Sequence, residues 1–295
     1  MEKEYQLLKF NKPLENEGEQ VLKIVESVKA VVDEENTNWS FEDLKGEMLR
    51  SFEEAGRKAL EENQGTIFVT LSGGIDSTLG LAMLRKNFPD AKIVAFTMGG
   101  SEEHSDVIHA RLAAEKFSAE HREIIPNQDD IQEALEEYQK EFPNADIKKA
   151  VADGDFDVYL LYKNISKMNP KLLIAYDGID ELTGGYWGHR KGESAEERKK
   201  AFAEYWKKLI PNHLRPLLAT SKKFDIRLIF PFLNKDLASM ISKIPISDRV
   251  SDEIGKLPIR ELAKAFEIPE EIIKRSKRGQ VGMLEIKGWE RNSRK

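Results

Sequence analysis

The 295-residue sequence contains no cysteine. This absence excludes disulfide bonds, thiolate metal sites and sulfur transfer through a cysteine persulfide. It also weighs against a cysteine-dependent glutaminase within these residues. Histidine is scarce as well, and the five histidines show no metal-ligand spacing, so we expect them to be surface or structural residues.

Long apolar runs and a strong excess of one charge are also missing. No apolar run approaches the ~20 residues that span a bilayer, and the first residues have neither the basic start nor the apolar core of a signal peptide. Charged residues make up 33% of the chain, with both signs interspersed and a net charge of −6. We therefore expect a cytoplasmic protein that binds neither membrane nor nucleic acid.

The most informative stretch runs from Gly65 to Arg85. Its first part predicts a buried strand and its last part a helix that ends on cations. Between them lies Ser-Gly-Gly-Ile-Asp-Ser, residues 72–77, whose glycines let backbone N–H groups approach an anion at a helix N-terminus. The carboxylate of Asp76 would repel a phosphate unless a metal ion lay between them, so the loop predicts bound Mg²⁺.

This loop differs from the G-x-x-x-x-G-K-[ST] loop of ordinary NTPases, because it has no lysine to bind a transferring γ-phosphate. It suits holding the β,γ-pyrophosphate of ATP as a leaving group while a nucleophile attacks the α-phosphate. The six residues match the S-G-G-[ILV]-D-S signature at every position, and the chain here resembles the PP-loop ATP pyrophosphatase superfamily. The missing cysteine weighs against its tRNA-thiolating members. The resemblance implies an ATP and pyrophosphate site at Ser72, Gly73, Gly74, Asp76 and Ser77.

A second group of carboxylates follows a strand that we expect at residues 172–176. Asp177, Asp180 and Glu181 would repel one another without a cation to relieve them. Residues 175–186 are similar to the motif S-G-E-G-S-D-E-x-F-G-G-Y of the asparagine synthetase family. That resemblance implies that Asp76 and Asp180 hold Mg²⁺. It also implies that Asp177, in the place of a glutamate, takes part in forming an acyl-adenylate.

The same alignment extends to the nucleotide pocket. Where the family has Ser-Gly, this chain has Ala175 and Tyr176, so we expect the nucleotide contact to differ there and Tyr176 to narrow the pocket. Leu71 and Met98 fall on the positions that flank the adenine in the family, although apolar strand residues can also be plain core.

A third block, Lys256–Arg260 and residues 268–279, resembles the family's C-terminal elements K-x-x-x-R, L-P-x-x-I and R-x-K-x-G. Lys277 falls on the lysine that reaches the active site in asparagine and β-lactam synthetases. The resemblance implies a catalytic cation there, which would stabilise charge on the α-phosphate and pyrophosphate.

The match is weaker at Asp225–Asn234, which corresponds to the family's G-x-E-x-R-x-P-F-L-D. An ungapped alignment pairs Arg227 and Ile229 with the glutamate and arginine. An alignment with two extra residues pairs Asp225 and Arg227 with them, and we prefer it because a shift of two preserves the face of a strand. Either alignment alters the pocket for the acyl substrate, so the sequence does not establish aspartate as that substrate.

Helices and strands alternate over the first two thirds of the chain. We expect strands at 66–71, 92–98, 121–125 and 172–176, and helices at 21–32, 40–63, from 105, at 130–142 and at 159–168. This pattern predicts an α/β fold with a parallel sheet and helices on both faces. We expect an N-terminal extension (1–40) and a PP-loop domain (41–295), with its nucleotide-binding sheet at 41–188 and a mainly helical part at 189–295.

The resemblance covers roughly Asp43 to Met283 and implies an AMP- and pyrophosphate-forming amide-bond synthetase that uses ATP and Mg²⁺. Fewer than 70 residues precede the first strand, so the chain resembles a synthetase domain without its glutaminase domain. We expect a small carboxylate, aspartate or an analogue, as acyl substrate, and ammonia or an amine as the nitrogen source. The sequence leaves open whether a separate glutaminase subunit supplies the nitrogen and whether the chain forms a homo-oligomer. It also leaves open two alternative functions: a PP-loop ligase for another carboxylate or a nucleobase, and an ATP-binding subunit without turnover.

Overall fold

The computed structural model describes residues 16–32 and 37–275. Five strands form one parallel sheet in the order β3-β2-β1-β4-β5. The strands are β1 (Thr66–Thr70), β2 (Lys92–Met98), β3 (Glu120–Ile124), β4 (Leu172–Ile174) and β5 (Arg227–Ile229). The chain adds β2 and β3 on one side of β1, and β4 and β5 on the other. The switch point, where α/β sheets bind ligands, therefore lies between β1 and β4.

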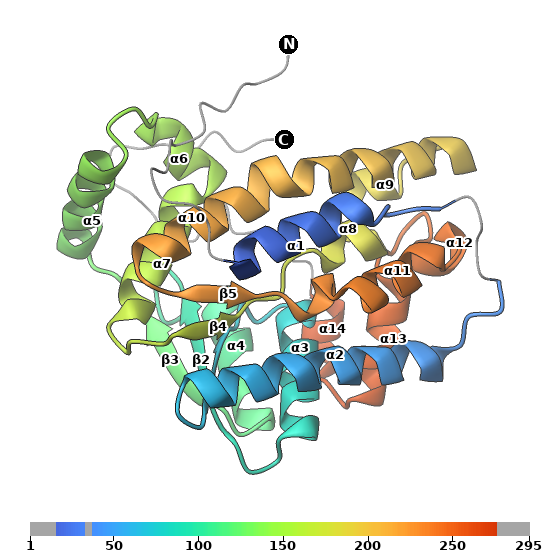
Figure 1. The fold of residues 1–295 in the computed structure, drawn as a ribbon, viewed down its shortest axis with the longest axis horizontal. Coiled ribbons are helices and arrows are strands. Elements are labelled where there is room, and N and C mark those ends of the chain that lie inside the picture. The colour runs from blue at the N-terminus through green and yellow to red at the C-terminus, as the bar shows by residue number, and fades with distance from the viewer. Residues whose placement is uncertain (1–15, 33–36, 276–295) are drawn as a thin grey trace.

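Helices cover both faces of the sheet, which confirms the expected fold class (Figure 1). One face is covered by α2 (Phe41–Glu62), α3 (Ile75–Asn87) and α4 (Ser105–Lys116), and the other by α5 (Gln128–Glu141), α6 (Ile147–Asp153), α7 (Asp155–Ser166) and α10 (Arg215–Lys223). Right-handed crossovers account for this division of the helices that connect strands, because the chain moves across the sheet in opposite directions before and after β3.

The remaining elements pack around the carboxyl ends of the strands. They are α8 (Ile179–Thr183), the short helix η1 (Trp187–His189), α9 (Ala195–Leu209), the π-helical turn η2 (Ile210–Leu214), the short helix η3 (Pro231–Leu233), α11 (Lys235–Lys243), α12 (Ile246–Arg249), α13 (Leu257–Ala265) and α14 (Glu270–Lys274). One strand, β5, thus comes from the part that we expected to be mainly helical.

Helix α1 (Asn16–Ser27) begins and ends earlier than the expected range of 21–32. It packs against β5, η2 and η3 (Figure 1). Its Val21 and Val25 are buried, and the indole of the buried Trp206 donates to the carbonyls of Val25, at 3.1 Å, and Val28, at 2.7 Å. The segment that we treated as an extension therefore contributes to the core of the domain.

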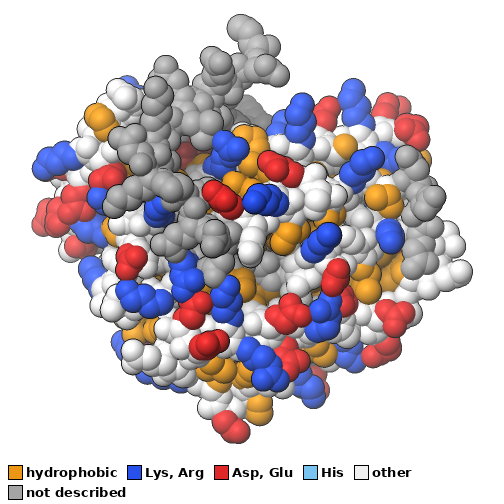
Figure 2. All heavy atoms as spheres, in the orientation of Figure 1, with side chains coloured by type: hydrophobic (Ala, Val, Ile, Leu, Met, Phe, Trp, Pro, Cys, Tyr) orange, Lys and Arg blue, Asp and Glu red, His pale blue; other side chains and the backbone are white. Residues whose placement is uncertain are grey.

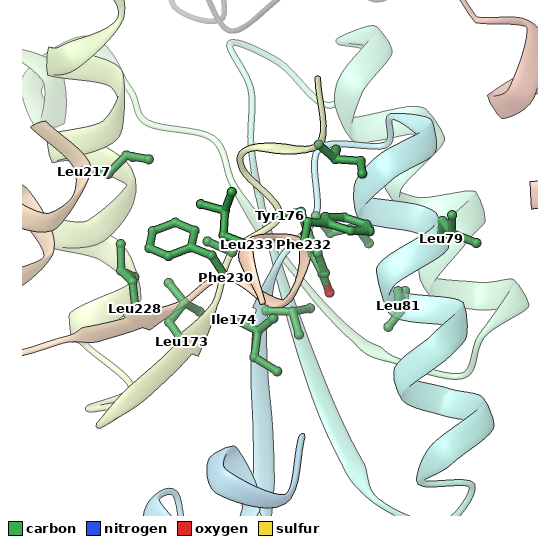
Figure 3. Close-up of a cluster of buried hydrophobic side chains, with 14 of the residues drawn as sticks. Leu79, Leu81, Leu173, Ile174, Tyr176, Leu217, Leu228, Phe230, Phe232 and Leu233 are labelled. Carbon is green, nitrogen blue, oxygen red and sulfur yellow. The ribbon is translucent and has the colours of Figure 1, made fainter. Parts of the chain in front are cut away.

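The apolar core continues from the sheet into the loops that follow its strands (Figure 3). Tyr176 lies there beside Phe232, with ring centroids 6.3 Å apart, and beside Phe52 at 6.1 Å. A Cβ added at Gly80 of α3 would lie 2.1 Å from the Tyr176 ring. The ring of Tyr176 therefore packs against α3, and the same residue also lines the cavity at the carboxyl ends of the strands, so the expectation that it narrows the nucleotide pocket stays a prediction.

The structure does not support the preferred alignment of Asp225 and Arg227 with the family's acyl pocket. Both residues lie at the amino end of β5, since Arg227 is in register with Leu172 at the start of β4. Asp225 pairs with Lys171 at 2.9 Å and Arg227 pairs with Glu62. Ligands bind at the opposite, carboxyl ends of such strands.

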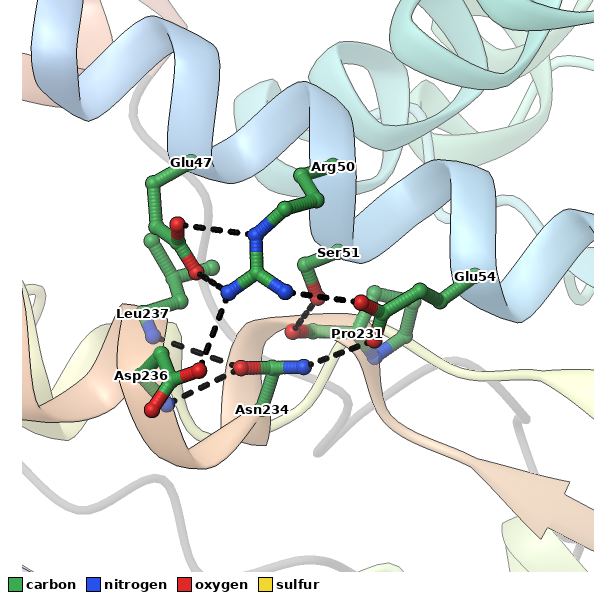
Figure 4. A network of polar contacts seen from close by, with 8 residues as sticks. All are labelled: Glu47, Arg50, Ser51, Glu54, Pro231, Asn234, Asp236 and Leu237. Carbon is green, nitrogen blue, oxygen red and sulfur yellow. Dashed lines mark hydrogen bonds and ion pairs between the residues drawn. The ribbon is translucent and has the colours of Figure 1, made fainter.

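The end of the same segment joins α2 to α11 (Figure 4). Ser51 donates to the carbonyl of Pro231 at 2.7 Å, and Asn234 caps α11 while donating to Glu54 at 3.2 Å. Arg50 bridges carboxylates on both helices, Glu47, Glu54 and Asp236. This part of the segment serves as a structural anchor.

Acidic and basic side chains are interspersed over the face shown in Figure 2. Within the described ranges, we find no helix whose length and apolar character would let it span a bilayer.

Candidate active site

A cavity of about 600 Å³ opens at the carboxyl ends of β1, β2 and β4. The strand ends and the loops after them bring together most of the residues that the sequence pointed to. Those that line the cavity are Leu71, Ser72, Gly74, Asp76, Ser77, Met98, Ala175, Tyr176, Asp177 and Asp180. Gly73, between Ser72 and Gly74, is not part of the lining, and Lys277 lies outside the described residues.

The Ser-Gly-Gly loop is held by its own hydroxyl groups. The Ser72 backbone N–H donates to Ser77 Oγ at 3.1 Å, and the two serine hydroxyls lie 3.0 Å apart. Gly73 has φ +63°, and a Cβ there would lie 2.6 Å from the backbone of α4 at Asp106 and Ala110. Only glycine fits this close approach, which brings the first turn of α4 against the loop.

A lysine outside our predicted site set joins the two predicted metal ligands. Lys256 Nζ lies 2.6 Å from Asp76 Oδ2 and also contacts Asp180 Oδ1. The side chain is only 11% exposed. Burial alone would lower its pKa, but the charges of Asp180 and Asp76 outweigh burial and hold the pKa above its ordinary value.

The backbone around this ion pair is specialised to allow it. Lys256 has φ +60°, which is uncommon for a residue with a side chain, and its N–H donates to the Thr183 carbonyl at 3.0 Å. A Cβ added at Gly185 would lie 1.6 Å from Asp180 Oδ1. The glycine of the second motif is therefore needed so that Asp180 can face Lys256. The K-x-x-x-R element marked Lys256 in the sequence, but nothing there showed where its side chain goes.

The carboxylates of Asp76 and Asp180 suit Mg²⁺, because they already converge on one cation, the Lys256 ammonium. Among the described residues, no group of three or more acidic or histidine side chains is placed to hold a metal alone. Magnesium does not need such a cage, since it commonly uses one or two carboxylates together with substrate phosphates and water. The two aspartates therefore fit the predicted role.

Arg275 ties the loop to α4. Its guanidinium donates to the carbonyls of Gly73, at 3.0 Å, and Ser72, at 3.4 Å, and forms an ion pair with Asp106. The side chains of Arg275 and Asp106 are 10% and 6% exposed. Because the peptide bonds are trans, a carbonyl and the following N–H point in opposite directions. Arg275 thus fixes the directions of the N–H groups of Gly73 and Gly74.

At the far end of the cavity, His213 pairs with Asp177. The distance between His213 Nε2 and Asp177 Oδ1 is 2.5 Å, and both residues line the cavity. His213 lies in the π-helical turn η2, between α9 and α10. Our expectation that the histidines are surface or structural missed this pair. A π-helical turn, a feature frequent at functional sites, leaves no clear signal in a single sequence.

Glu181, the third carboxylate of the second motif, lines the cavity together with Asp177 and Asp180. It is buried, and the Tyr186 hydroxyl donates to it at 2.8 Å. Burial, helped by the charge of Asp180, raises the pKa of Glu181 to about 7.

The geometry is that of a nucleotide-binding α/β domain with its phosphate loop at the switch point of the sheet. A sequence model of the asparagine synthase family matches residues 47–225 and 219–292. The chain therefore belongs to the asparagine synthase family. The matched region includes Lys277.

Curated relatives agree with this membership. The chain is 30% identical over 251 residues to "Asparagine synthetase [glutamine-hydrolyzing]" of Gallus gallus, which covers 82% of this chain and 44% of the relative. It is 29% identical over 246 residues to the Mesocricetus auratus protein of the same name, with 81% and 43% covered. The chain thus spans less than half the length of these relatives.

Among solved structures, similarity extends to an NMN synthetase from Francisella tularensis, with TM-score 0.45, 17% identity and coverage of 84% of this chain and 80% of that one. An NH₃-dependent NAD synthetase from Campylobacter jejuni has TM-score 0.37 and 20% identity, and covers 71% of this chain and 94% of its own.

Proposed function

We propose that this chain catalyses ATP-dependent synthesis of an amide bond, forming AMP and pyrophosphate. The observation that supports this most strongly is the convergence of Asp76 and Asp180 on Lys256 beside the Ser-Gly-Gly loop. Two carboxylates and a cation next to a phosphate cradle suit a reaction that releases a highly charged pyrophosphate. Membership of the asparagine synthase family supports the same chemistry.

In the first step, a carboxylate oxygen of the acyl substrate attacks the α-phosphorus of ATP, and the bond to the bridging oxygen breaks. The loop residues Ser72, Gly73, Gly74 and Ser77 hold the departing pyrophosphate, with Lys256 and Lys277 as cations. Leu71, Met98 and the backbone of residues 175–176 bind the adenine side. Asp76 and Asp180 would hold Mg²⁺, which when bound neutralises charge on the pyrophosphate.

In the second step, ammonia or an amine attacks the acyl carbon of the adenylate, and the bond between that carbon and the AMP oxygen breaks. Asp177, which lines the cavity and pairs with His213, would face this acyl group. Positioning and electrostatic stabilisation supply the rate, and no covalent bond to the enzyme is required.

The acyl substrate is aspartate or an analogue by family membership, but one observation favours another carboxylate. Asp225 and Arg227 lie at the far end of the sheet. The cavity that holds Asp177 and His213 is lined in part by the apolar side chains of Val158, Leu161 and Leu217. An apolar lining suits an acyl group with an apolar carbon skeleton. The nitrogen would come as ammonia, as an amine, or from a separate glutaminase.

The test measures AMP and pyrophosphate release from ATP and Mg²⁺, with aspartate and ammonium and then with a panel of other carboxylates. Asp76→Asn should abolish release, and Asp225→Asn is the matched control, because Asp225 is exposed and lies at the far end of β5. Release that depends on a carboxylate and on Asp76 supports the proposal. ATP binding without release for every carboxylate would instead favour a nucleotide-binding subunit without turnover.

A further inference from the structure

We propose that His213 is the general base of the amide-forming step, with Asp177 orienting its ring. This inference rests on the proposed function and assigns a residue to its second step. His213 would take the proton that the attacking nitrogen loses.

The contact with Asp177 determines which ring nitrogen of His213 accepts the proton. A carboxylate only accepts hydrogen bonds, so Nε2 of His213 must donate to Asp177 across their 2.5 Å contact. In its neutral form, which predominates only above its raised pKa, the ring carries its hydrogen on Nε2 and has a lone pair on Nδ1. The His213 side chain is 37% exposed and lines the cavity, so a bound nucleophile can reach it.

The position of the ring is fixed by two elements. The turn η2 leads directly into α10, so that Leu217, one helical turn after His213, lines the same cavity. Asp177 follows β4 at the switch point of the sheet. The pair thus links the loop after β4 to the start of α10. A ring held from both sides keeps the fixed orientation that a general base needs.

The charges around the ring suit an amine substrate. Four carboxylates act on it: Asp155 from α7, Asp177 after β4, and Asp180 and Glu181 from α8. Burial would lower the pKa of His213, but its pairing with Asp177 and the charges of Glu181 and Asp180 raise the pKa to about 9. This value lies between those of an α-amino group, ~7.7, and a lysine, ~10.4. The base form of His213, like the unprotonated form of an amine substrate, therefore becomes populated as the pH approaches about 9, and amide formation should rise over this range.

The step balances without a further reactant. The nitrogen lone pair attacks the acyl carbon, the C–O bond to AMP breaks, and AMP leaves with that electron pair. One proton moves from the nitrogen to Nδ1 of His213 and then to water. The earlier formation of the adenylate transfers no proton from a nucleophile, so His213 should matter only afterwards.

The experiment separates the two steps in His213→Gln, whose amide can keep the hydrogen bond to Asp177 but cannot accept a proton. ATP–pyrophosphate exchange reports adenylate formation, with the carboxylate that gives the fastest exchange in the wild type. Amide formation is measured at pH 9, where the base form of His213 is populated, with ammonium and with hydroxylamine, which is already unprotonated at that pH. His109→Gln is the matched control, because His109 of α4 does not line the cavity and glutamine keeps the Cβ that lies beside Gly73.

We expect exchange to stay within about threefold of the wild type, and ammonium-dependent amide formation to fall by about 10²-fold or more. Hydroxamate formation should fall by less than about tenfold, because hydroxylamine needs less help from a base. An equal loss with both nucleophiles, or a parallel loss of exchange, would overturn the role of His213. Absence of exchange in the wild type would instead overturn the proposed function.

Discussion

Lys256 Nζ lies 2.6 Å from Asp76 Oδ2 and also contacts Asp180, so one buried ammonium joins the first turns of α3 and α8. These two helices follow the neighbouring strands β1 and β4, whose carboxyl ends meet at the switch point of the sheet. Without the ammonium, two partly buried carboxylates would face each other. The same cation is therefore part of the fold and part of the candidate site.

Replacing this cation should destabilise the protein. We expect Lys256→Met to lower the free energy of unfolding by about 3 kcal/mol, because it leaves buried charges uncompensated. Urea titration measures the change, and added Mg²⁺ should restore part of the stability of this variant. Lys264→Met, which breaks an exposed pair with Glu261, should change stability by no more than about 0.5 kcal/mol. A Lys256 variant as stable as the wild type would contradict the prediction.

Arg275 should control pyrophosphate binding more than nucleoside binding. Arg275→Met frees the carbonyls of Ser72 and Gly73 and leaves Asp106 without its buried partner. We expect affinity for inorganic pyrophosphate to fall by about tenfold, the loss of about 1.4 kcal/mol of charge-assisted hydrogen bonding. Calorimetric titration with pyrophosphate and with AMP provides the comparison. AMP affinity should hardly change, and equal losses for both ligands would show a general disruption instead.

The His213–Asp177 pair should be visible by titration. We expect the imidazole of His213 to titrate near pH 9 in NMR spectra of the wild type, and nearer its ordinary pKa in Asp177→Asn. Because the folded-state pKa is raised, the stability that this pair contributes is fully present below the ordinary pKa, ~6.5. It is lost as the pH rises from there through about 9. An unchanged titration in the variant would show that Asp177 does not set the pKa.

Two helical glycines should respond oppositely to alanine. Gly46 of α2 has nothing within 4 Å of an added Cβ, so Gly46→Ala should raise stability by about 1 kcal/mol through helix propensity. At Gly80 of α3 the same Cβ would lie 2.1 Å from the ring of Tyr176. We expect Gly80→Ala to cost about 1–3 kcal/mol by overpacking. Thermal unfolding measures both, and Tyr176→Leu should relieve part of the Gly80 effect.

Local signals in the sequence determined a large part of this protein. The β-branched runs before Ser72 and at residues 92–98 specified β1 and β2, because buried parallel strands read as continuous apolar runs. The strand-loop-helix order placed Asp76 in the first turn of α3, and the second acidic motif placed Asp177 at the end of β4. Both motifs belong to the cavity because each follows a strand whose carboxyl end faces it.

Only the tertiary structure decided which side chains meet across long sequence separations. The sequence did not reveal that Lys256 reaches Asp76, that His213 reaches Asp177, or that Asp225 and Arg227 lie at the wrong end of β5. A pattern specifies the face and the type of an element, but a contact depends on strand order, on helix packing and on turns such as η2. Those are set by burial of the whole apolar core, to which distant segments contribute together.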